Sequence, residues 1–129
     1  MKILAVFGTR PEAIKFAPLI KKIEEDENIT LRVCLSGQHL ELLDQVISFF
    51  DIKTDYRLEL MRPNQRLNAF ASTFLNSISD VLIEVHPDLV LVQGDTTTSF
   101  IAALAAFYAG IPVGHIEAGL RSFDMQEPF

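Results

Sequence analysis

Residues 2–18 read KILAVFGTRPEAIKFAP, and they predict how the fold begins. The run 2–8 is almost continuously apolar, as strands are in a parallel sheet that is covered on both faces. Thr9, Pro11 and Glu12 then match a helix start, with an N-cap residue, a proline in the first turn and the glutamate of a capping box. We therefore expect a buried strand that leads directly into a helix.

The same alternation continues along the chain. Further strands are expected over 30–37, 55–61, 89–95 and 111–119, and helices over 10–25, 38–50, 65–86 and 96–110. Repeated strand–helix units imply an α/β fold with a doubly wound, Rossmann-like parallel sheet, for which we expect the strand order 3-2-1-4-5. Such sheets bind ligands beyond the carboxyl ends of the strands where the order reverses, here between strands one and four. The helix over 96–110 is apolar on most of its faces, so it should be well covered.

Composition limits the possible functions. The 129 residues suffice for one domain or part of one, and a net charge of −6 argues against a nucleic-acid partner. The longest apolar run, 99–114, is broken by Gly110 and Pro112, so no membrane-spanning segment is expected. The single cysteine, Cys34, excludes an internal disulfide, fits a reducing cytoplasm and is interpreted as core packing.

Charged residues follow three of the predicted strands. Arg10 comes after the first strand with Lys15 a little more than one helical turn later, Asp95 is at the tip of the fourth, and Glu117 is near the end of the fifth. Because the carboxyl ends of parallel strands meet at one edge, these side chains should converge. Arg10, Lys15 and two helix N-termini would form an anion site, and the two carboxylates would serve as general acid and base.

Simpler interpretations exist for each of these residues. Asp95 fits the N-cap of the helix that it precedes, and Lys15 fits a solvated helix face. Glu117 is different, because an unpaired carboxylate within an apolar strand is costly, which favours a partner or a function. His115 is interpreted as a hydrogen-bonded core histidine. The three histidines are dispersed, so no metal site is expected.

Four segments together resemble UDP-N-acetylglucosamine 2-epimerases of the non-hydrolysing type. They are FGTRPEAIK at 7–15, QH at 38–39, QGDTTT at 93–98 and AAFYAGIPVGHIEAGLRS at 105–122. The resemblance implies a GT-B fold, in which two Rossmann-like domains enclose the active site between them. Residues 1–129 would form most of the N-terminal domain, while the C-terminal, UDP-binding domain would come from the same or a separate chain.

The resemblance also implies a reaction and the residues that perform it. The family interconverts UDP-N-acetylglucosamine and UDP-N-acetylmannosamine without a nicotinamide cofactor, by eliminating UDP to give a 2-acetamidoglucal and adding it back. By motif match, Asp95 and Glu117 are the acid/base carboxylates. The same match assigns substrate binding to Gly8, Arg10, Lys15, Thr96 and Arg121. UDP, the sugar nucleotide and a second copy of the chain are the expected partners, in the cytoplasm.

The sequence departs from the family's pattern in places. Gln38 and His39 match the start of an allosteric substrate site, but Leu40 and Glu41 differ from the residues usually found there, and an acidic Glu41 is unfavourable near a diphosphate. Gln93 replaces the usual histidine. A third acid/base glutamate, a catalytic histidine and most UDP contacts would lie beyond these residues, so we expect this piece alone to be inactive.

Two alternatives remain open on the sequence. One is a hydrolysing 2-epimerase, which shares the fold but releases N-acetylmannosamine and UDP because water captures the glycal. The other is a non-catalytic half-domain that binds nucleotide sugars and requires a separate partner.

Overall fold

The computed structural model describes residues 1–37, 40–61, 64–119 and 122–127. In this part of the chain, five strands form one sheet in the order β3-β2-β1-β4-β5, and every pairing is parallel. This confirms the predicted α/β class, the doubly wound Rossmann-like sheet and the reversal between strands one and four. The strands are β1 (Lys2–Phe7), β2 (Thr30–Leu35), β3 (Tyr56–Arg57), β4 (Leu89–Gln93) and β5 (Val113–Ile116).

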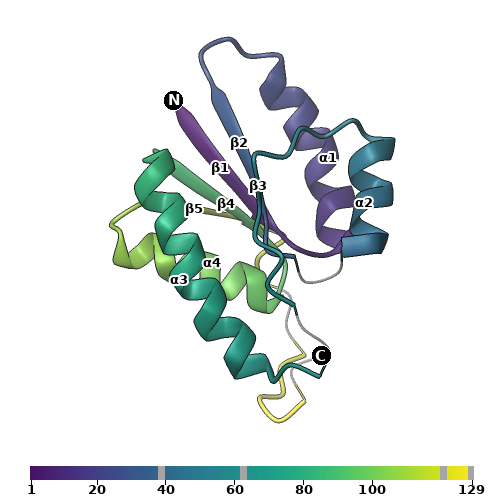
Figure 1. Cartoon of the computed structure of the whole chain (residues 1–129), viewed down its shortest axis with the longest axis vertical. Coiled ribbons are helices and arrows are strands. Elements are labelled where there is room, and N and C mark those ends of the chain that lie inside the picture. Colours follow the sequence, from purple (N-terminus) through teal and green to yellow (C-terminus); the bar gives the residue numbers. More distant parts are fainter. Residues whose placement is uncertain (38–39, 62–63, 120–121, 128–129) are drawn as a thin grey trace.

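Helices cover both faces of the sheet (Figure 1). Those in the described ranges are α1 (Arg10–Glu24), α2 (Leu40–Phe49), α3 (Leu67–Val85) and α4 (Thr97–Tyr108). α1 and α2 pack on one face, and α3 and α4 pack on the other. Right-handed crossovers require this division, because the chain winds outward from β1 to β3 and then returns past β1 to β4 and β5.

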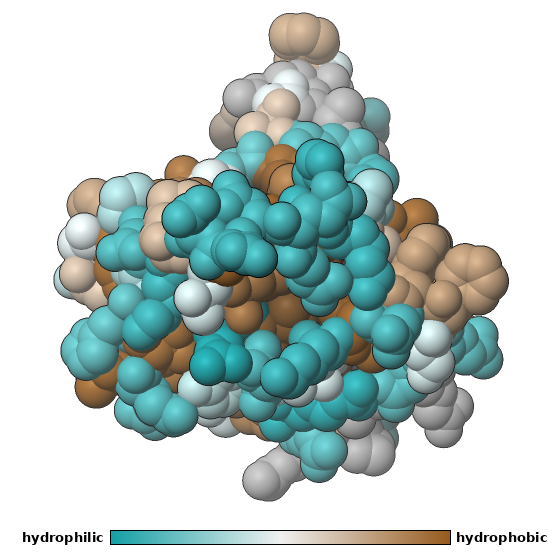
Figure 2. All heavy atoms as spheres, turned by 90° about the horizontal axis from the view of Figure 1, so that it is seen from above, coloured by the Kyte–Doolittle hydropathy of each residue, from teal (hydrophilic) through white to brown (hydrophobic). Residues whose placement is uncertain are grey.

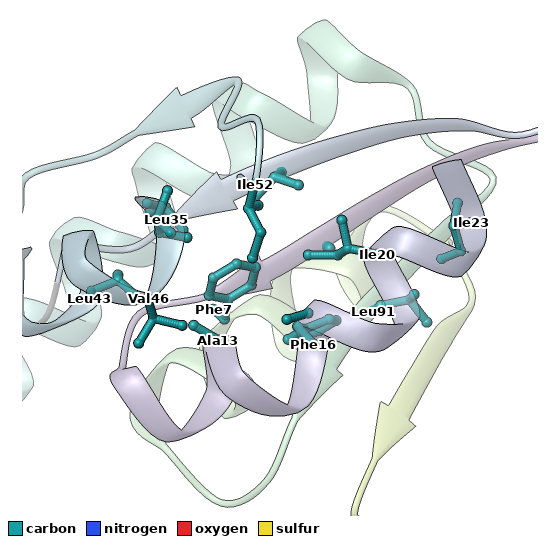
Figure 3. Close-up of a cluster of buried hydrophobic side chains, with 14 of the residues drawn as sticks. Phe7, Ala13, Phe16, Ile20, Ile23, Leu35, Leu43, Val46, Ile52 and Leu91 are labelled. Carbon is teal, nitrogen blue, oxygen red and sulfur yellow. The ribbon is translucent and has the colours of Figure 1, made fainter. Parts of the chain in front are cut away.

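The strands bury side chains on both faces, as their nearly continuous apolar sequences predict. Ile3, Ala5 and Phe7 of β1 face α1 and α2, and the alternate residues Leu4 and Val6 face α3 and α4. In the first of these clusters, the ring of Phe7 stacks on Phe16 of α1 with 4.9 Å between centroids (Figure 3). The sheet thus separates two apolar clusters, and its carboxyl edge remains for polar residues.

Two expectations about individual elements were wrong. The strand expected over 55–61 is limited to Tyr56–Arg57, because Glu59 has a φ of 40° and turns the chain out of the extended conformation. Helix α4 is covered on one side only: Phe100, Phe107 and Tyr108 are 66%, 75% and 69% exposed. Within the described residues, this helix packs mainly against α3 and the sheet, and these three side chains stay exposed.

The two edges of the sheet differ. β3 pairs with β2 through only two residues, whereas β5 pairs with β4 through all four of its residues and has no further strand beyond it in the described ranges. Seen from the end where β1 begins, the surface is mainly hydrophilic, with hydrophobic atoms visible between the polar side chains (Figure 2). None of the described helices combines the length and hydropathy needed to cross a bilayer.

Candidate active site

The connection from β1 to α1 is built around two residues. Thr9 is the N-cap of α1, and the carboxylate of Glu12 accepts hydrogen bonds from the backbone N–H of Thr9 at 2.7 Å and of Gly8 at 2.9 Å. This confirms the predicted helix start. Gly8 also allows a close approach, because a Cβ at this position would lie 1.9 Å from the hydroxyl of Ser36, which follows β2.

Glu12 makes contacts that the sequence did not predict. It is buried, at 1% exposure, and it also accepts a hydrogen bond from Thr96 Oγ1 at 2.6 Å. The hydroxyl of Ser99 lies 3.3 Å from the same carboxylate oxygen. The carboxylate therefore joins the start of α1 to the start of α4. Its capping pattern was visible in the sequence, but nothing in the sequence indicated partners more than 80 positions away.

Helix α4 starts at Thr97, so the residue that precedes it is Thr96 rather than Asp95. Thr96 is the N-cap, and its hydroxyl accepts the hydrogen bond from the backbone N–H of Ser99 at 3.1 Å. The interpretation of Asp95 as the N-cap is therefore wrong. Asp95 is exposed, and within the described residues its carboxylate forms no hydrogen bond or ion pair, which leaves it available to a ligand.

Glu117 lies in the turn after β5, not inside the strand. Its φ of 58° marks the point where the chain leaves the sheet, and its side chain is 34% exposed. Oε2 of Glu117 accepts hydrogen bonds from Lys15 Nζ of α1 and from the side-chain amide of Gln93 at the end of β4. The expectation that this carboxylate has a partner is confirmed, although the reason was not burial in an apolar strand.

These side chains surround one pocket of about 510 Å³ at the carboxyl ends of β1, β4 and β5. Of the residues predicted for the site, Lys15, Asp95, Thr96 and Glu117 line it. Thr9, Glu12, Gln93, Ser99, Phe100 and His115 are among the other lining residues. The pocket lies at the predicted reversal of strand order, so the topology alone brings these separate segments together.

Arg10 and Gly8 do not line this pocket. Arg10 is exposed and borders a separate hollow of about 350 Å³ with Phe49 and other residues of α1 and α2. Of the expected anion site, Lys15 and the starts of both helices line the pocket, whereas Arg10 lies outside it. The amides of Gly8 and Thr9 already donate to Glu12, so the anion held at the start of α1 is a side chain of the protein itself.

Sequence reasoning also misplaced His115. This residue is exposed at the pocket, where its Nε2 lies 2.6 Å from the backbone oxygen of Gly94, so it is hydrogen-bonded but is not a core residue. Gln93 was noted only as a departure from the family's pattern, and its contact with Glu117 had no signal in the sequence. In the described part of the chain, no three His, Cys, Asp or Glu side chains are grouped as metal ligands.

Three predicted residues lie outside the described residues: Gln38 and His39 of the expected allosteric site, and Arg121 of the expected substrate site. Cys34, in contrast, is fully buried among the side chains facing α3 and α4, which confirms its interpretation as core packing. Burial raises the pKa of its thiol from 9.0 to about 12, so Cys34 is not a nucleophile near neutral pH.

Sequence comparison identifies relatives along the whole chain. A family model described as UDP-N-acetylglucosamine 2-epimerase matches residues 21–129. The UDP-N-acetylglucosamine 2-epimerase of Neisseria meningitidis serogroup A is 56% identical over all of this chain and 35% of its own length. A putative enzyme of the same name from Thermotoga maritima is 54% identical, and the match covers 34% of it. The chain therefore spans about a third of the length of the curated relatives it matches.

Solved structures that resemble this chain belong to the same family as its sequence relatives. The crystal structure of UDP-GlcNAc 2-epimerase from Neisseria meningitidis bound to UDP-GlcNAc matches all of this chain and 35% of that one, with a TM-score of 0.95 and 56% identity. The Methanocaldococcus jannaschii enzyme in complex with UDP-GlcNAc and UDP has a TM-score of 0.91 and 35% identity, covering 98% of this chain and 35% of that one. The resemblance drawn from the motifs is thereby confirmed, and the chain belongs to the UDP-N-acetylglucosamine 2-epimerase family.

Proposed function

We propose that the complete protein interconverts UDP-N-acetylglucosamine and UDP-N-acetylmannosamine, and that these residues supply one side of its active site. The observation that carries the proposal is the convergence of Lys15, Asp95 and Glu117 on one pocket from three separate elements. Family membership supports the choice of substrate, because related structures contain UDP-GlcNAc and UDP. We further propose Arg10, Gly8, Thr96 and Arg121 as substrate-binding residues, on the motif match.

The proposed reaction is an elimination followed by an addition. A base removes the proton at C2, the C1–O bond to the diphosphate breaks, and a double bond forms between C1 and C2 of the bound 2-acetamidoglucal. UDP then adds back at C1, and C2 receives a proton on its opposite face. No net oxidation or reduction occurs, so the reaction requires no nicotinamide cofactor.

Two carboxylates are placed to act as the acid and base of the proton transfers. Asp95 and Glu117 line the same pocket but project from different loops, after β4 and after β5. A reaction that removes a proton from one face and returns it to the other needs acid/base groups that approach C2 from two directions. Oε1 of Glu117 has no hydrogen bond within the described residues and is the oxygen that can exchange a proton.

Lys15 is suited to stabilise the departing UDP. Its ammonium pairs with Glu117 here, and a bound diphosphate would attract the same charge. As the C1–O bond breaks, negative charge accumulates on the diphosphate, and a positioned cation in a pocket stabilises that charge. We propose that Lys15 contacts both Glu117 and the departing UDP, which would couple proton transfer to bond cleavage.

The proposed assembly is larger than this chain. Because the relatives are about three times longer, we propose a second Rossmann-like domain that closes the site and binds most of the UDP, as in a GT-B fold, and we propose that residues 1–129 alone are inactive. Exposed apolar side chains support a homodimer: Leu42 and Phe49 on α2, and Leu67 and Ile83 on α3. We propose the cytoplasm, where nucleotide sugars are made, as its location.

Proton NMR in D₂O tests the proposal directly. The longest polypeptide that the gene encodes is incubated with UDP-N-acetylglucosamine, and both the C2 proton and the nucleotide linkage are followed. We expect UDP-N-acetylmannosamine that carries deuterium at C2 and retains its nucleotide.

Other products would support the alternatives. Free N-acetylmannosamine with UDP would indicate a hydrolysing enzyme. Bound but unchanged sugar nucleotide, with a folded and complete protein, would indicate a binding module and would overturn the epimerase proposal. A negative result with residues 1–129 alone would agree with the proposed inactivity of this piece.

A further inference from the structure

The Glu12 carboxylate lies between the N-termini of two helices. Its Oε2 accepts from the backbone N–H groups of Gly8 and Thr9 and from the Thr9 hydroxyl, at 2.7–2.9 Å. Its Oε1 accepts from Thr96 Oγ1 at 2.6 Å. Within the described residues, no lysine or arginine pairs with it. Hydrogen-bond donors and the positive ends of α1 and α4 therefore stabilise this buried charge.

A capping box explains only half of these contacts. The bonds to Gly8 and Thr9 are local and would form in an isolated helix. The contacts with Thr96 and Ser99 cross 84 and 87 positions of sequence and join elements that lie on opposite faces of the sheet. A carboxylate that served only as a cap would not need to be buried against the start of another helix.

The network around Glu12 extends toward the three residues proposed for proton transfer and for the leaving group, which are Asp95, Glu117 and Lys15. Thr96 directly follows Asp95, so the bond from Thr96 to Glu12 fixes the loop that carries Asp95. The Ser99 hydroxyl, which has a single hydrogen, contacts both Glu12 and the backbone oxygen of Gln93. The Gln93 side chain in turn donates to Glu117, and Lys15 lies one helical turn after Glu12 on α1.

From these contacts we infer that Glu12 is a positioning residue, which holds the starts of α1 and α4 together so that Lys15 and Asp95 face the same pocket. Its buried carboxylate acts through Thr96 and Ser99 and does not contact the reacting atoms. The catalytic part of this inference rests on the proposed function, whereas the mechanical part, the coupling of the two helix starts, does not.

Hydrogen exchange tests the mechanical part without any substrate. In the full-length protein, Glu12→Gln keeps the size of the side chain but replaces one acceptor oxygen with a donor. We expect faster backbone exchange in peptides covering 8–12 and also in those covering 94–100. The matched control is Glu24→Gln in the last turn of the same helix, where the carboxylate is 39% exposed and pairs with Lys21. It should leave both segments unchanged.

A purely local role gives a different result. If Glu12→Gln accelerates exchange over 8–12 only, the residue is a helix cap and the inference is overturned. Thr96→Val leaves the carboxylate in place and removes its partner. Should Glu12→Gln fail to fold, faster exchange over 8–12 in Thr96→Val reports the coupling, whereas exchange over 94–100 also reflects the lost N-cap of α4. Thr96→Ser, which keeps the hydroxyl, should restore wild-type exchange.

Kinetics test the catalytic part. Misplacing a proton-transfer group by about 1 Å lowers rates on the order of 100-fold, so we expect Glu12→Gln to reduce kcat for C2 exchange by about that factor, with a smaller change in KM. Because both substitutions remove the Glu12–Thr96 hydrogen bond, the loss of kcat in the double variant should be smaller than the product of the two single losses. Independent, multiplying losses would argue against coupling. A wild-type protein without C2 exchange would overturn the proposed function, and hydrogen exchange alone would then decide the role of Glu12.

Discussion

Lys15 and Glu117, 102 positions apart in the sequence, form an ion pair that joins α1 to the turn after β5. Gln93 donates to the same oxygen of Glu117, so two donors hold one carboxylate oxygen of a residue that lines the pocket. The pair thus connects an early and a late segment of the chain beside the position where the strand order of the sheet reverses. The contribution of this ion pair to folding stability can be measured separately from its contribution to catalysis.

Replacing Lys15 by methionine should separate them. The two side chains are 45% and 34% exposed, and solvent-screened pairs of this kind contribute about 0–1 kcal/mol to stability. We therefore expect almost unchanged thermal unfolding but a large loss of C2 exchange, on the order of 100-fold or more. The control is Lys22→Met, because Lys22 pairs with Glu25 on the outer surface. Equal activity of the two variants would contradict a role for Lys15.

Asp95→Asn should lose activity without losing stability. The carboxylate has no partner within the described residues, so its removal breaks no native contact, while loss of an acid/base group costs about 10²–10⁴ in rate. Thr96→Val should in addition lower the folding stability, because loss of an N-cap costs about 1 kcal/mol. Thermal melts and C2 exchange of both variants measure the contrast. A destabilised Asp95→Asn protein would show that Asp95 has a structural role.

Gly8→Ala should destabilise the protein through one identifiable contact. The new Cβ would lie 1.9 Å from Ser36 Oγ and 3.0 Å from Thr98 Oγ1, and overpacking of this kind costs about 1–3 kcal/mol. Adding Ser36→Gly removes the closest atom and should recover part of the loss. If Ser36→Gly brings no recovery in the unfolding midpoint, the cause lies elsewhere in the β1–α1 connection.

Cys34 should make stability depend on pH in alkaline solution. Burial raises the pKa of its thiol from 9.0 to about 12 in the folded state, so from about pH 9 upward the unfolded chain releases this proton first. The folded state then binds more protons than the unfolded state, and its stability falls as the pH rises toward 12. Cys34→Ala should lack this contribution, so the difference between the two pH profiles measures it. Parallel profiles would contradict the shift.

The fold could be predicted from the sequence because the patterns that indicate strands and helices lie within short segments. Apolar runs such as 2–8 and 89–95 predict buried strands, and the connections between them leave few possible topologies. The end of β3 was not predictable in this way, because the turn at Glu59 depends on a single positive φ. The open face of α4 was missed for a different reason, since the apolar character of a helix does not tell which of its sides other elements cover.

The candidate site was predictable in outline only. The topology placed Lys15, Asp95 and Glu117 at one edge of the sheet, and the structure brings them into one pocket. Hydrogen-bond partners such as Glu12–Thr96 depend on rotamers and on approaches of a few tenths of an ångström, which carry no periodic signal. The place of Arg10 was not predictable either, because it is close to Lys15 in sequence but borders a different hollow.

The unequal edges of the sheet have a practical consequence for producing this protein. β3 offers almost no backbone to a foreign strand, whereas the outer edge of β5 presents a row of N–H and C=O groups with no strand beside it in the described ranges. Bare edges of this kind recruit other chains. We therefore expect residues 1–129 alone to self-associate through β5 as their concentration rises, and a charged residue placed on that edge to reduce the association.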